Sequence, residues 1–367
     1  MRAPGRLRVL LLARQRGGLM DQRARALAAR AGPGVDVELA HRPVTPQGAR
    51  ALVARVLTAR VDAVYVFDTN PRELAPAVLR RLRGTPLVLE AGDAVAAHMR
   101  AIGAGRARVA WRGAFERGGW HGADVLVVRG EGFRDVLSEL GVTRPVHVLP
   151  DGVDLGRFRP DAPTRFRRRV GLSEDAVAIG VVGSIVWNPR AQTAYGWELV
   201  EALPLVPPRV HAVVVGEGDG VAHLRARAAE LGVADRLVTP GRVPHDLVPD
   251  VLGGLDAVTW TQTPDAVGRC RTTMKLPEYL ACGKYVLASD VGEARRCVTA
   301  NGYRIPYAGG RDPAYVSGLV DAIRALAADP SLAARGLLGV ATARRFAWER
   351  IGAGFAGVLH EAVARAR

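Results

Sequence analysis

The sequence of 367 residues has only three cysteines and no long apolar run, and each shortage excludes a class of protein. Cys270, Cys282 and Cys297 lack CxxC spacing and are odd in number, which argues against a metal or redox cluster and against a disulfide framework. No apolar stretch approaches the roughly 20 residues that cross a bilayer, so no spanning helix is expected. Val9–Ala13 is too short for the core of a signal peptide and predicts a buried strand. The sequence therefore favours a cytoplasmic protein with reduced thiols.

Positive charge is abundant but uneven along the chain. The net charge is +15, and only Lys275 and Lys284 among 51 basic residues are lysines. Residues 1–150 carry 24 Arg against 13 acidic residues, a net +11, whereas residues 151–367 carry 27 basic and 23 acidic residues, a net +4. Coding bias in a GC-rich genome explains the arginines, but it explains the asymmetry less well. The basic half would attract an anionic acceptor or a membrane surface, and because it lacks a recognition motif for nucleic acid, we expect no nucleic-acid partner.

Short apolar runs alternate with longer segments of helical periodicity, which is typical of parallel βα units, and the length favours two domains. In the first half the predicted strands are Arg8–Ala13, Val35–Ala40, Ala63–Phe67, Pro86–Glu90, Asp124–Val128 and Val146–Leu149, with helices over Gln22–Ala31 and Leu74–Leu82. In the second half the predicted strands are Ala178–Val182, His211–Val215, Leu237–Thr239, Ala257–Thr261 and Tyr285–Ala288.

A boundary between two Rossmann-like, doubly wound α/β domains that face each other across a cleft is predicted at Pro150–Asp154, because the apolar periodicity lapses in the charged stretch Arg157–Arg169 that follows. We assign one domain to residues 1–150 and the other to residues 151–345, with a C-terminal helix over 346–367 packing back toward the first. Ligands of open α/β sheets bind beyond the carboxyl ends of the strands, so the loops that follow strands are expected to carry the chemistry.

The loop after the strand Ala178–Val182 combines small, amide and cationic residues. Gly183 and Ser184 would let the backbone approach a ligand, and Asn188 and Arg190 follow, of which the guanidinium suits phosphate oxygens. An ordinary strand-to-helix connection with a surface arginine is the alternative.

Two further loops of the second half are weaker candidates. Gly216 opens a glycine-rich turn that fails the GxGxxG dinucleotide fingerprint because valine stands at the third glycine position. Arg242 and Val243 follow the strand Leu237–Thr239 and could present their backbone to a nucleobase edge.

The segment around the two lysines is the richest. Thr272 and Thr273 stand where helix N-cap residues belong, before a predicted helix over Met274–Ala281. Lys275 and Glu278 lie three residues apart and so share a helix face. Helix amides, threonine hydroxyls and the ammonium would suit a diphosphate, and the carboxylate would suit ribose hydroxyls. A surface salt bridge on an ordinary capped helix is the alternative.

These motifs, in this order, resemble the retaining glycosyltransferases of family four, the glycosyl transferases group 1 with the GT-B fold. The resemblance covers about residues 124–367 and rests on the segments Val146–Phe158, Asp235–His245, Asp256–Thr261, Met274–Asp290 and Arg345–Glu349. It implies an N-terminal acceptor domain and a C-terminal domain that binds a nucleotide-diphosphate sugar. Two positions depart from the family pattern, because Asp151 replaces an asparagine and Cys270 replaces a glutamate that contacts the donor sugar.

The resemblance also implies a role for individual residues. Arg242 and Val243 would hold the base, Glu278 the ribose, and Arg190 would be a second cation. The diphosphate would be held by Thr272, Thr273, Met274 and Lys275. Transfer would retain the anomeric configuration, with the departing diphosphate helping to deprotonate the acceptor, so that neither a metal nor another cofactor is needed.

In the N-terminal half the candidates are less specific. Gly18, after the first strand, would approach the donor phosphate, and Asp93 with His98 would meet the reacting hydroxyl; a surface aspartate and a structural histidine are the alternative. The arginines of residues 100–117 surround Trp111, which suits an anionic small metabolite, a lipid-linked acceptor or peripheral contact with the inner membrane face. A solvated helix face is the alternative there.

Two other functions fit the same architecture. A nucleotide-sugar 2-epimerase would act on the donor without an acceptor, and a non-catalytic donor-binding subunit would bind the nucleotide without turnover.

Overall fold

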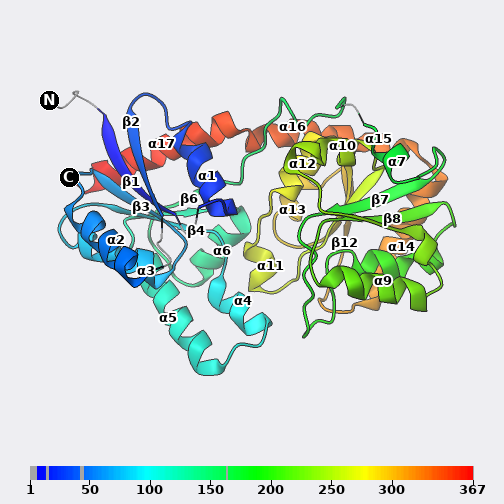
Figure 1. Cartoon of the computed structure of the whole chain (residues 1–367), viewed down its shortest axis with the longest axis horizontal. Coiled ribbons are helices and arrows are strands. Elements are labelled where there is room, and N and C mark those ends of the chain that lie inside the picture. Colours follow the sequence, from blue (N-terminus) through cyan, green and yellow to red (C-terminus); the bar gives the residue numbers. More distant parts are fainter. Residues whose placement is uncertain (1–5, 14–15, 42–44, 163, 367) are drawn as a thin grey trace. The chain divides into compact units, whose positions relative to one another are not determined.

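The computed structural model describes residues 6–13, 16–41, 45–162 and 164–366, and the chain divides into two compact units (Figure 1). Unit 1 comprises Met1–Gly152, Cys270–Thr272 and Ala347–Arg367. Unit 2 comprises Val153–Arg269 and Thr273–Phe346. The C-terminal segment thus belongs to the unit formed by the N-terminal half.

Unit 1 is built on a six-stranded parallel sheet in the order β2-β1-β3-β4-β5-β6. Its strands are β1 (Leu7–Ala13), β2 (Val35–His41), β3 (Ala63–Phe67), β4 (Leu87–Ala91), β5 (Val125–Val128) and β6 (Val146–Val148). Its helices are α1 (Leu19–Ala28), α2 (Pro46–Thr58), α3 (Pro71–Arg81), α4 (Val95–Ala101), α5 (Arg106–Gly122), α6 (Glu131–Glu139) and α17 (Trp348–Arg365).

Alternation along the strands of unit 1 gives the sheet two buried faces. Val9 and Leu11 pack with α1 and α17, whereas Leu10 and Leu12 point to the opposite face, where α2, α3 and α6 pack (Figure 1). Both faces of a parallel sheet must be covered, and β1, β3, β4 and β5 are accordingly almost wholly apolar. Only Glu90 interrupts these runs with a charge, apart from the start of β1.

Unit 2 contains a second six-stranded parallel sheet, in the order β12-β11-β10-β7-β8-β9. Its strands are β7 (Val177–Val182), β8 (Val210–Val215), β9 (Leu237–Gly241), β10 (Ala257–Trp260), β11 (Tyr285–Ser289) and β12 (Gly302–Ile305). Its helices are α7 (Phe166–Arg169), α8 (Trp197–Ala202), α9 (Gly220–Glu230), α10 (Val248–Gly253), α11 (Ala266–Cys270), α12 (Lys275–Ala281), α13 (Ala294–Cys297), α14 (Pro313–Ala328), α15 (Ser331–Ala334) and α16 (Gly339–Ala343). Short 3₁₀ turns span Leu203–Leu205, Ala234–Arg236, His245–Leu247, Arg335–Leu338 and Arg344–Phe346.

The strand orders identify where ligands bind in such sheets. Read from β9, the order in unit 2 is 3-2-1-4-5-6, so the winding reverses between β7 and β10, and in unit 1 it reverses between β1 and β3. The carboxyl ends of β7 and β10 therefore mark the expected ligand edge of unit 2, and the loop that begins at Gly183 lies there.

The predicted strands are confirmed, with ends shifted by at most two residues, whereas β12 was not predicted. β12 is an edge strand whose two central residues, Tyr303 and Arg304, are exposed, so it has no apolar run to mark it. The helix predicted from Leu74 begins at Pro71, because the Asn70 side chain accepts a hydrogen bond from the amide of Arg72 and proline suits the first turn.

Candidate functional site

Two glycines bring the strand-end loops of unit 2 into close contact. Gly183 follows β7 with φ 143° and Gly216 follows β8 with φ 146°, a region that other residues rarely adopt. A Cβ on Gly216 would overlap the carbonyl of Gly183, and a Cβ on Gly183 would overlap Cε of Lys275 and lie 2.9 Å from its Nζ. Both predicted positions therefore require glycine, and the Lys275 side chain lies directly against the backbone at the end of β7.

The ammonium group of Lys275 is buried at this point. Its Nζ lies 3.7 Å from the centroid of the Tyr195 ring, and less than 1 Å² of Nζ is exposed. The Tyr195 hydroxyl accepts a hydrogen bond of 3.3 Å from Nε2 of Gln262, in the loop after β10. A cation over an aromatic face is attracted by the ring quadrupole. A single positive charge is thus held at the switch point of the sheet by residues from three separate loops.

Glu278, on the same helix, makes a different contact. Its side chain is 9% exposed, and its Oε1 lies 2.6 Å from Nε2 of His245, which begins a 3₁₀ turn after β9. The other ring nitrogen of His245, Nδ1, lies 2.7 Å from Nη2 of Arg157. Lys275 and Glu278 thus share one short helix but contact different loops, and sequence reasoning assigned no role to His245 or Tyr195.

Among the remaining predicted residues of unit 2, some side chains contact the protein itself and others are exposed. Oδ1 of Asn188 accepts hydrogen bonds from the amides of Arg190 and Ala191, so this side chain holds its own turn. Arg242 forms an exposed ion pair of 3.0 Å with Glu217, and Val243 packs partly against the core. Ser184 and Arg190 are also exposed.

The prediction that Thr272 and Thr273 cap the lysine helix is wrong. α12 begins after Met274, which has a helical backbone and makes no capping hydrogen bond with its side chain. Thr273 Oγ1 instead accepts a hydrogen bond of 3.1 Å from Nε1 of the buried Trp260, whose indole needs an acceptor. The division between the two units passes between Thr272 and Thr273, and the buried Thr272 hydroxyl has no hydrogen-bond partner among the described residues.

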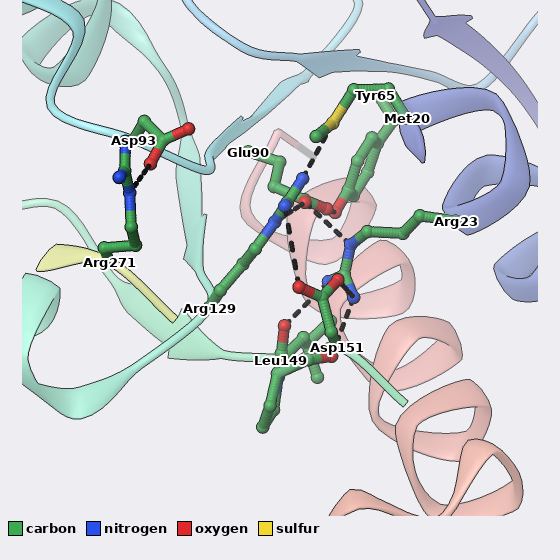
Figure 2. Close-up of polar contacts among 10 residues, drawn as sticks. Met20, Arg23, Tyr65, Glu90, Asp93, Arg129, Leu149, Asp151 and Arg271 are labelled. Atoms are coloured by element: carbon green, nitrogen blue, oxygen red, sulfur yellow. Dashed lines mark hydrogen bonds and ion pairs between the residues drawn. The ribbon is translucent and has the colours of Figure 1, made fainter. Parts of the chain in front are cut away.

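Figure 2 shows the carboxyl edge of the sheet in unit 1, where Asp93 follows β4. Asp93 is half exposed and forms an ion pair of 3.6 Å with Nε of Arg271. His98 is half-buried on α4, and among the described residues no hydrogen bond or ion pair joins it to Asp93. Gly18 precedes α1 with an ordinary extended backbone, whereas its neighbour Gly17 has φ 79° and donates its amide to Asp21.

A buried charge network lies beside this edge and was not predicted (Figure 2). Glu90, at the end of β4, accepts hydrogen bonds from Arg23 at 2.8 Å, from Arg129 at 3.1 Å and from the Tyr65 hydroxyl at 2.5 Å. Burial alone would raise the pKa of Glu90, but the two guanidinium groups outweigh it and hold the pKa below its ordinary value.

The same network fixes the segment where the chain leaves unit 1. Arg23 donates hydrogen bonds of 2.7 Å to the carbonyls of Leu149 and Pro150, and both arginines approach the carboxylate of Asp151. Asp151, which departs from the family's asparagine, therefore balances the second buried guanidinium. The sequence signal was a glutamate within the apolar run of β4.

Cys270 does not lie on an open surface. It is fully buried and packs into the hydrophobic core of unit 1, in the cluster that includes Ala91 and Ala94. The position where the family has a donor-contacting glutamate is thus filled by a small apolar contact.

Two parallel six-stranded sheets, with glycine loops and a buried lysine at the switch point of the second, define a GT-B protein. Residues 176–329 match the family model described as Glycosyl transferases group 1, in agreement with the resemblance. The chain is 32% identical over 234 residues to the D-inositol 3-phosphate glycosyltransferase of Xylanimonas cellulosilytica, covering 60% of this chain and 52% of that protein. The chain thus spans about half the length of the curated relatives it matches.

Solved structures confirm the fold class over almost the whole chain. Sucrose-phosphate synthase from Thermosynechococcus elongatus superposes with a TM-score of 0.76 at 18% identity, covering 98% of this chain and all of that one. Anabaena Alr3699/HepE in complex with UDP gives a TM-score of 0.75 at 19% identity, with 97% and 100% coverage.

The described residues contain neither a membrane-spanning helix nor a cluster of metal ligands. Across residues 6–13, 16–41, 45–162 and 164–366 no helix is long and apolar enough to cross a membrane. In the same part of the chain no group of three or more histidine, cysteine, aspartate or glutamate side chains is arranged to hold a metal ion.

Proposed function

We propose that this protein transfers a sugar from a nucleoside-diphosphate sugar to an acceptor hydroxyl, with retention of the anomeric configuration and without a metal. The observation that carries the proposal is the buried Lys275 ammonium against Gly183, at the switch point of a glycosyl transferases group 1 domain. UDP is the nucleotide that we expect, because related folds have been crystallised with it.

In this proposal each side chain has a separate task. Lys275 neutralises charge that develops on the departing diphosphate, and the backbone around Gly183 leaves room for the phosphates to approach. Glu278 accepts hydrogen bonds from the ribose, Arg242 and Val243 contact the base, and Arg190 supplies a second positive charge. The departing phosphate oxygen takes the proton of the acceptor hydroxyl on the face where the new bond forms.

For the acceptor we propose a phosphorylated polyol. The relative cited above is named for D-inositol 3-phosphate, and residues 1–150 carry a net charge of +11 that would attract such an anion. Asp93 is then the carboxylate nearest the reacting hydroxyl, and Arg271, which pairs with it, can turn toward the phosphate.

We also propose a cytoplasmic protein with peripheral contact to anionic membrane through α4 and α5. Ile102 and Trp111 are 50% and 58% exposed there. The only acidic residue of the segment 100–117, Glu116, is buried and accepts hydrogen bonds from the amides that begin α4. The exposed basic residues around them are Arg100, Arg106, Arg108 and Arg117. The wild type should co-sediment with phosphatidylglycerol vesicles but not with phosphatidylcholine vesicles, and Trp111→Ser should no longer co-sediment with phosphatidylglycerol. Equal recovery of the wild type with the two kinds of vesicle would contradict the proposal.

The experiment that tests the function begins with thermal shifts in UDP, GDP and dTDP, because a ligand bound to the native state raises the apparent stability. Turnover is then measured with the matching nucleotide sugar and inositol phosphate, with and without EDTA, and the anomeric configuration of the product is read by NMR. Lys275→Ala should lower kcat by about 10²-fold to 10³-fold, and Glu278→Ala should mainly weaken nucleotide binding. Conversion of the nucleotide sugar without acceptor would identify an epimerase, and binding without any turnover a donor-binding subunit.

A further inference from the structure

His245 lies where three parts of unit 2 meet. It stands two residues after Val243 and three after Arg242, the predicted base-contacting residues, on the loop after β9. Its ring nitrogens contact Glu278 on α12 and Arg157 in the segment that precedes α7. Its ring also lies 5.4 Å from that of Phe158, centroid to centroid. The histidine therefore joins the loop expected to read the base to the side chain expected to bind the ribose.

The contacts determine which ring nitrogen carries the proton. A guanidinium can only donate hydrogen bonds, so Nδ1 of His245 accepts from Arg157. In the neutral imidazole the other nitrogen, Nε2, then carries the hydrogen and donates it to Oε1 of Glu278 at 2.6 Å. Arg157 thus fixes the tautomer that can hold the carboxylate, and a hydrogen bond to an ionised acceptor is short and strong.

From this arrangement we infer that His245 is a positioning residue for nucleotide binding, an inference that rests on the proposed function. By holding Oε1 it sets the rotation of the Glu278 carboxylate, so that Oε2 is presented to the ribose hydroxyls. Because His245 shares its loop with Arg242 and Val243, the same hydrogen bond aligns the base contacts with the ribose contact. A carboxylate without this partner would rotate, and part of the binding free energy would be needed to order it.

The test compares His245→Phe, which keeps a ring against Phe158 but cannot donate, with His245→Gln, whose amide can donate in place of Nε2. Exposed His360, at the far end of the sequence, gives the matched control His360→Ala. Affinity is measured by calorimetry for UDP and for 2′,3′-dideoxy-UDP, which lacks both ribose hydroxyls. Thermal unfolding of each variant without nucleotide shows whether it is folded.

We expect His245→Phe to weaken UDP binding about tenfold, the size of a lost hydrogen bond to a charged group. His245→Gln should restore most of that loss, and His360→Ala should bind like the wild type. Binding of 2′,3′-dideoxy-UDP should be nearly the same in all four proteins. The analogue already lacks the hydroxyls that Glu278 would bind, so a change at His245 has no further contact to weaken.

Two results would overturn the inference: unchanged UDP affinity in His245→Phe, or an equal loss for UDP and its dideoxy analogue, which would indicate a general loop effect. Failure of the wild type to bind UDP, GDP or dTDP is a different result, and it would refute the proposed function itself.

Discussion

Replacing Tyr195 by leucine removes the aromatic face on which the Lys275 ammonium lies, 3.7 Å from the ring centroid, while keeping a side chain of moderate volume. Without the ring the lysine gains rotamers that nucleotide binding must freeze again. Ordering one such side chain costs about 0.5 to 1.5 kcal/mol, so UDP should bind about twofold to tenfold more weakly. Tyr195→Phe keeps the ring and loses the hydroxyl that accepts from Gln262, so its affinity should stay within about twofold of the wild type.

Calorimetric titration with UDP and with uridine separates this effect from a general loss of structure. Uridine has no phosphate for Lys275 to contact, so Tyr195→Leu should leave its affinity unchanged. In a Lys275→Ala background the leucine substitution should have no further effect on UDP, because its partner is absent. An equal loss for UDP and uridine, or an equal loss in Tyr195→Phe and Tyr195→Leu, would refute the reasoning.

Three further predictions concern a glycine loop and two buried carboxylates. Gly183→Ala should lower both the melting temperature and the UDP affinity, because the new Cβ overlaps Lys275, whereas Gly232→Ala, at φ 68° with open space around it, should lower only the melting temperature. Glu90→Gln should destabilise the protein by about 3 to 5 kcal/mol in urea unfolding, since it leaves two buried guanidinium groups with less negative charge. The folded-state pKa of Glu90 is lowered, so the wild type should lose this stability as pH falls below 4.5. A free energy of unfolding that does not change with pH below 4.5 would contradict the stabilising role of the ionised Glu90. Burial raises the pKa of Glu198 from 4.5 to about 7, so wild-type stability should fall as pH rises through that interval, and Glu198→Gln should remove this part of the pH dependence of the melting temperature.

The sheets could be predicted because the apolar pattern of a buried strand lies in consecutive residues of the sequence. Strands buried on both faces of a parallel sheet carry a continuous apolar run, as β3, β5 and β7 do, and eleven of the twelve strands in the described residues were predicted. β12 escaped because Tyr303 and Arg304 face solvent at the sheet edge. The same local reasoning placed Gly183 and Lys275 on the ligand edge of unit 2, since a glycine after a strand and a helix start both mark that edge.

Contacts between distant segments could not be predicted in this way. Tyr195 and His245 lie far along the chain from the side chains they hold, and no spacing rule connects them. The threonine prediction failed for the same reason, because Trp260, thirteen residues earlier, takes the Thr273 hydroxyl as its acceptor. Glu90 is the exception, since a carboxylate inside an apolar strand can persist only with buried partners.

The two lysines show how far composition alone carries an argument. In a chain so rich in arginine, a retained lysine indicates a place that needs a compact ammonium, and both lysines are at least partly buried. At Lys284, however, the ammonium donates a 3.0 Å hydrogen bond to the carbonyl of Leu255, and burial lowers its pKa, so its role is structural. Lys275 differs because its ammonium lies at the switch point of the sheet, against a glycine loop. A lysine in this chain therefore indicates a place too small for a guanidinium. Only its position within the fold shows whether that place is a ligand site or a contact in the core.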